Sequence, residues 1–78
     1  MKEIQLVDVT IHIDRDSDDA TRSEIEKALR AAEGVISVHM PAEERHLVVV
    51  EYNPDAIKSL DLLHIVQGFS RHADLIGL

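Results

Sequence analysis

Residues 7–14 read Val-Asp-Val-Thr-Ile-His-Ile-Asp, an alternation of apolar and polar side chains that decides the fold. Such alternation is typical of a β-strand with one buried face and one open face. We therefore predict that the odd positions of this strand face the core. His12 and Asp14 are then expected on the opposite face.

Two stretches repeat apolar residues at helical spacing. The first follows the acidic and hydroxyl residues 16–19, which favour the start of a helix, and it ends before Gly34. The second begins near Ser59, a residue that can cap it. The predicted apolar stripes are Ile25, Ala28, Leu29 and Ala32 in the first helix, and Leu62, Ile65, Val66 and Phe69 in the second.

Three further strands complete the pattern. We predict strands over residues 35–40 and 46–52, joined by a short polar connection that favours an antiparallel hairpin, and a short edge strand over residues 73–78. The resulting order is that of an α+β fold, the ferredoxin-like βαββαβ sandwich. Right-handed crossovers would place both helices on one face of its four-stranded antiparallel sheet.

Length and charge narrow the function. We interpret the 78 residues as one domain, 1–78, in which an enzyme is not expected because so small a fold offers little pocket volume. The net charge of -7 repels phosphate backbones, so nucleic acid is not an expected partner. No apolar run reaches the roughly 20 residues that a membrane helix needs, and we expect a cytoplasmic protein without membrane insertion.

Four phrases of the chain resemble the heavy-metal-associated (HMA) domain family: residues 25–29, 34–38, 50–54 and 73–76. The resemblance implies the same fold and a role in metal transport or detoxification. Members of that family bind soft ions such as copper(I) through a Cys-x-x-Cys pair just before the first helix. This chain has no cysteine.

Asp18 and Thr21 stand where those cysteines would be. Their oxygen atoms are hard ligands that do not suit copper(I). We expect both residues in the first helical turn, where Thr21 and Glu24 also match the spacing of a capping box.

The five histidines are the candidate chemistry. In the predicted topology His12, His39, His46 and His72 all lie toward one edge of the sheet, which is also the edge where the resembled family holds its metal. Two of them, His12 and His72, are predicted to be cross-strand neighbours. With Asp14 or Asp74 as an oxygen ligand, they would suit zinc, nickel or copper(II).

A second interpretation needs no metal. Leu47 and Val49 are predicted to lie on the sheet face that carries no helices, where apolar side chains often mark an interface. The chain would then be a protein-interaction or regulatory module that forms a homodimer or binds a protein partner through this face. The sequence leaves the two interpretations open.

Overall fold

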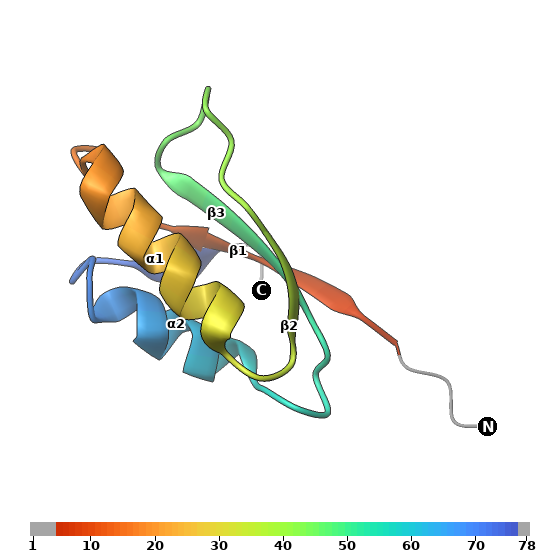
Figure 1. The fold of residues 1–78 in the computed structure, drawn as a ribbon. Helices are drawn as coiled ribbons and strands as arrows, with labels where there is room; N and C mark the ends of the chain where they lie inside the picture. Colours follow the sequence, from red (N-terminus) through yellow and green to blue (C-terminus); the bar gives the residue numbers. More distant parts are fainter. Residues whose placement is uncertain (1–4, 77–78) are drawn as a thin grey trace.

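A computed structural model describes residues 5–76 of the chain. Its six elements follow one another in the predicted order. The four strands form one antiparallel sheet with the strand order β2-β3-β1-β4 (Figure 1). The predicted ferredoxin-like arrangement is therefore confirmed. The elements are β1 (Val7–His12), α1 (Asp19–Ala31), β2 (Val35–His39), β3 (Leu47–Tyr52), α2 (Ser59–Gln67) and β4 (Asp74–Ile76).

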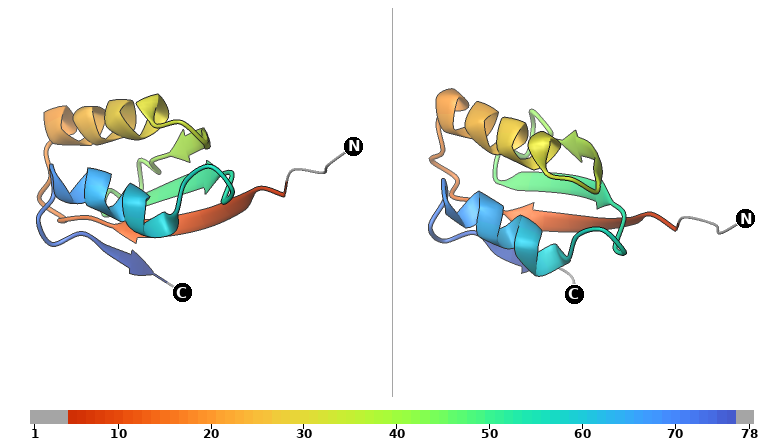
Figure 2. Two further views of the ribbon diagram at one scale, coloured as in Figure 1. Left: turned by 90° about the horizontal axis from the view of Figure 1, so that it is seen from below. Right: turned by 60° about the horizontal axis from the view of Figure 1, so that its bottom comes forward.

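Both helices cover the same face of the sheet (Figure 2). The odd positions of β1 face them, and Ile11 is completely buried between Val48 on β3 and Leu75 on β4. The predicted inward face of residues 7–14 is thus confirmed from Val9 onward, while Val7 lies at the exposed start of the strand. The buried apolar residues form one core: Val9, Ile11, Ile13, Ile25, Leu29, Val38, Val48, Val50, Tyr52, Leu62, Val66 and Ala73.

Helix α1 begins with a side-chain cap. Asp18 has extended backbone angles, and its carboxylate accepts a hydrogen bond of 2.8 Å from the backbone N–H of Thr21. The expected capping box that starts at Thr21 is therefore wrong, because Asp18 already caps the helix and Thr21 belongs to its first turn. This hydrogen-bonding from Thr21 lowers the pKa of the exposed Asp18 carboxyl below its usual value.

Helix α2 begins one residue away from the predicted cap. Lys58 is the capping position, and its N–H donates to the Asp61 carboxylate at 3.2 Å, so Ser59 is the first helical residue. Leu62 and Val66 are fully buried as predicted. The prediction for Phe69 is wrong: the helix ends at Gln67, and Phe69 follows it with 43% of its surface exposed.

Gly34 makes the sharp turn between α1 and β2. Its φ of +98° is a conformation that side chains rarely adopt, and a Cβ there would lie 2.8 Å from the Cβ of Ala56. Its carbonyl also accepts the N–H of Asn53 at 2.8 Å, which links this turn to the start of the connection between β3 and α2.

The structure encloses no pocket over residues 5–76. Within the same residues, neither helix is both long and apolar enough to cross a membrane.

Candidate functional site

The antiparallel order brings four histidines to one end of the sheet. There β1 and β2 end, at His12 and His39, while β3 and β4 begin just after His46 and His72. We call this end, with these four residues, the histidine edge. Its strands are fastened together by a hydrogen bond of 2.8 Å from the N–H of Ile13 to the carbonyl of His46.

His12 is paired with a carboxylate on the neighbouring strand. Asp74 is its partner in the register of β1 and β4, and Oδ1 of Asp74 lies 3.4 Å from Nδ1 of His12. The predicted direct pairing of His12 with His72 across the strands is wrong, because His72 precedes β4 by two residues. His12 and Asp74, both named as candidate ligands from the sequence, are nevertheless neighbours across the two strands.

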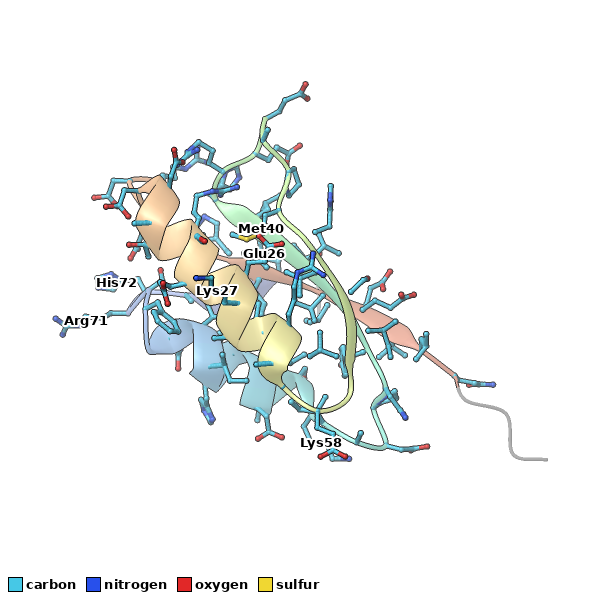
Figure 3. All side chains as sticks on the ribbon, viewed as in Figure 1. Glu26, Lys27, Met40, Lys58, Arg71 and His72 are labelled. Carbon is cyan, nitrogen blue, oxygen red and sulfur yellow. The ribbon has the colours of Figure 1, made fainter. Side chains whose placement is uncertain are left out.

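His72 forms a second pair, with Asp14. Their Nδ1 and Oδ1 atoms are 3.5 Å apart, and the His72 side chain projects outward from the connection between α2 and β4 (Figure 3). Asp14 is itself fixed by Ser70: the buried Ser70 hydroxyl donates to Oδ2 of Asp14 at 3.1 Å and accepts the N–H of Asp14 at 3.1 Å. The Ser70 hydroxyl therefore holds both the backbone and the carboxylate of Asp14 in place.

The sequence pattern did not predict the contact between His46 and His12. Its ring packs edge-on against the ring of His12, with the two ring centroids 5.4 Å apart. His46 lies just before β3, which begins at Leu47, so the alternation of that strand does not determine the position of its side chain. The hydrogen bond from the N–H of Ile13 to the carbonyl of His46 holds the backbones that carry the two rings side by side.

The other two histidines lie apart from this contact. His39 is exposed and is separated from β1 by strand β3. His64 is exposed on α2. Over residues 5–76, no three His, Asp or Glu side chains form a preassembled group that could hold a metal ion.

The loop where the resembled family carries its cysteines is held by two arginines. The buried Arg22 guanidinium donates to the carbonyl of Arg45. Arg45 in turn donates to the carbonyl of Ser17 at 3.2 Å and forms an ion pair of 2.7 Å with Asp19. These contacts connect the loop before α1 to the connection between β2 and β3.

Leu47 and Val49 lie where they were predicted. The register pairs Leu47 with His12 and Val49 with Thr10, positions whose side chains alternate with the buried Ile11 and Ile13. Both residues are therefore on the sheet face away from the helices, and both are half-buried.

Known structures share this fold. Oxidized MerP from Ralstonia metallidurans CH34 superposes with a TM-score of 0.78 at 19% identity, covering 94% of this chain and 100% of MerP. The N-terminal domain of a potential copper-translocating P-type ATPase from Bacillus subtilis, solved in its Cu(I)-loaded state, gives 0.73 at 29% identity, covering 91% and 85%. The CopZ metallochaperone gives 0.72 at 18% identity, covering 90% and 100%.

These neighbours define the class of protein by its fold. The HMA domain of the copper chaperone for superoxide dismutase is also among them. No family model matches the sequence, and no curated protein is matched by it. The chain therefore has the fold of these HMA domains, and it contains no cysteine.

Proposed function

We propose that this chain is a metal-handling HMA domain in which imidazole nitrogens at the histidine edge replace the missing thiolates. The ion would be a divalent cation of borderline softness: zinc, nickel or copper(II). The observation that carries the proposal is the contact between His12 and His46 beside Asp74. The solved neighbours support the general class, since several are described as copper-binding or as a metallochaperone.

The spacing of the two rings suits a shared ion. Two imidazoles bound to one tetrahedral zinc, each at about 2.0–2.1 Å through nitrogen, have ring centres roughly 5 Å apart. The rings of His12 and His46 are 5.4 Å apart. This separation of the ring centres would allow one nitrogen of each ring to bind a common ion once the side chains rotate into place.

Asp74 gives His12 the environment of a metal-binding histidine. Metal-bound imidazoles usually present one nitrogen to the ion while the other contacts a carboxylate, which orients the ring and makes it a stronger ligand. Asp74 lies beside Nδ1 of His12 and leaves Nε2 for an ion. We assign Asp74 this positioning role, and Asp14 plays the same part for His72 on the same edge.

The ligand chemistry selects among metals. Imidazole with oxygen ligands suits zinc, nickel and copper(II), whereas copper(I) prefers the thiolates that this chain lacks. Because residues 5–76 contain no preassembled three-ligand group, water or a partner must complete the coordination. We therefore expect weak, exchangeable binding, which is suited to carrying an ion and not to retaining it.

Calorimetric titration tests the proposal. Zinc, nickel and copper(II) are added to the wild-type chain and to His12→Ala and His46→Ala, with His64→Ala as the matched control on α2. We expect each of the first two variants to weaken binding at least tenfold and His64→Ala to change it less than twofold. Asp74→Asn should weaken binding by about 10–100-fold, the usual cost of losing a carboxylate behind a ligand.

His72→Ala tests the alternative ligand set. If His72 and Asp14 hold the ion, His72→Ala weakens binding more than His46→Ala does, and the site assigned to His12 and His46 is refuted. Absence of binding at millimolar metal would refute the metal-handling function itself.

A further inference from the structure

The backbone that carries His46 is held from two sides. On one side, the N–H of Ile13 donates to the carbonyl of His46 at 2.8 Å. On the other side, the carbonyl of the preceding residue, Arg45, accepts a hydrogen bond from the Arg22 guanidinium. The peptide groups of residues 45 and 46 are therefore bound to two different parts of the fold, helix α1 and the chain that leaves β1.

Arg22 is a buried charged residue of helix α1. It exposes 9% of its surface and lies on the same side of the helix as the buried Ile25 and Leu29. Burying a charged side chain costs free energy unless it gains hydrogen bonds. The bond that Arg22 makes is to a main-chain carbonyl, so it fixes the position of a backbone segment. That segment is the one that carries His46.

The side chain of Arg45 adds two contacts at the surface. Its guanidinium donates to the carbonyl of Ser17 at 3.2 Å and forms an ion pair of 2.7 Å with Asp19. Ser17 in turn donates its N–H and its hydroxyl to the carbonyl of Asp14, at 3.1 and 2.7 Å. Because exposed ion pairs contribute little by themselves, the buried hydrogen bond of Arg22 contributes the larger share of the restraint.

We propose that Arg22 is a positioning residue of the cation site, which acts from helix α1 by holding the backbone of His46 beside that of His12. This inference rests on the proposed function, because it takes His12 and His46 as the two imidazole ligands. A guanidinium has no free lone pair to offer a cation, so Arg22 acts only through the position of His46. The apparent affinity for an ion falls with the fraction of molecules in which both rings are in place.

Calorimetric titration with zinc gives the first measurement. Arg22→Met keeps a long side chain but removes the donor, and Lys27→Met on the exposed surface of the same helix is the matched control. We expect Arg22→Met to weaken zinc binding about three- to tenfold, and Lys27→Met to change it less than about twofold. Circular dichroism establishes that both variants are folded under the conditions of the titration.

A double-mutant cycle separates positioning of His46 from a general structural effect. A general effect would weaken binding whether or not His46 is present. Arg22→Met is therefore also introduced into the His46→Ala chain. If Arg22 acts through His46, it changes the remaining zinc affinity of that chain by less than about twofold, because both substitutions remove the same interaction. A full effect of Arg22→Met in the His46→Ala chain overturns the proposal.

A second measurement needs no metal. Nuclear Overhauser cross-peaks between the ring protons of His12 and His46 report the contact between the two rings, and EDTA keeps the sample free of ions. We expect these cross-peaks in the wild type and in Lys27→Met, and their loss in Arg22→Met. Cross-peaks that persist unchanged in Arg22→Met overturn the proposal. So does their absence from the wild type, because the ring contact is what Arg22 is proposed to maintain.

The outcomes distinguish this inference from the proposed function. If the wild type binds no zinc, the metal-handling function fails, and the cross-peaks alone decide whether Arg22 positions His46. If the wild type binds zinc through His12 and His46 and Arg22→Met binds it equally well, the function stands and this inference fails. Arg22→Gln, which is polar but too short to reach the carbonyl of Arg45, replaces Arg22→Met under the same criteria if that variant does not fold.

Discussion

At the residue scale, Asp18 is the side-chain cap of α1. Asp18 accepts the N–H of Thr21, and this interaction lowers the pKa of the Asp18 carboxyl. A carboxyl whose pKa is lowered on folding stabilises the fold at pH values above its unfolded pKa. That stabilisation is lost as the pH falls through the lower, folded-state pKa.

Asp18→Ala should therefore lower the midpoint of urea unfolding at neutral pH. The deficit should shrink as the pH falls through the lowered pKa of the wild-type Asp18 carboxyl, because the wild type then loses its charged cap too. Asp18→Asn keeps an acceptor without the charge, so it should lose less at neutral pH. Equal midpoints for the wild type and Asp18→Ala at neutral pH would contradict the capping role.

Arg22 is the second residue whose role is structural. Its buried guanidinium supplies a hydrogen bond to the carbonyl of Arg45 and so ties α1 to the connection between β2 and β3. Arg22→Met fills the same space without a donor, and loss of a hydrogen bond from a charged group costs roughly 1.5–3 kcal/mol in the free energy of unfolding. Urea unfolding measures this loss, and the exposed Lys27→Met on the same helix is the control. Similar losses for the two variants would contradict the assignment.

At the scale of the elements, the tightest constraint is the turn at Gly34. A Cβ at this residue would meet both an unfavourable φ of +98° and the side chain of Ala56 at 2.8 Å. Gly34→Ala should destabilise the domain by about 1–3 kcal/mol in urea unfolding. Gly68→Ala is the control, because Gly68 has helical angles of -65° and -19° that alanine adopts readily. A neutral Gly34→Ala would show that this turn rearranges at little cost.

The same scale shows why the fold was predictable and the site only partly so. Alternation along β1 fixes which side chains are buried, and it correctly placed His12, Leu47 and Val49 on the sheet face away from the helices. Alternation does not fix the offset between β1 and the three-residue β4, so the partner of His12 is Asp74 and not His72.

Residues outside regular elements are beyond such patterns. His46 precedes β3, and its ring position depends on a side-chain rotation that no periodicity determines. Helix starts were uncertain by a few residues because several adjacent polar residues can cap. Asp18 and Lys58 took that position in place of Thr21 and Ser59.

At the scale of the whole molecule, the chain has the fold of the solved HMA domains but contains no cysteine. The hydrophobic core and the arginine contacts at the loop stabilise this fold. The histidine edge is the surface to which we assign the proposed cation site. The acidic balance of the chain, at -7, favours the approach of cations.

The measurement that tests the metal-handling account most directly is a zinc titration followed through the ring ¹⁵N signals of the histidines by NMR. The account predicts that the ring nitrogens of His12 and His46 shift together from the first additions of zinc, while those of His64 keep their positions. If His12 and His46 stay unchanged, or if His64 shifts in parallel with them, the proposed site is contradicted.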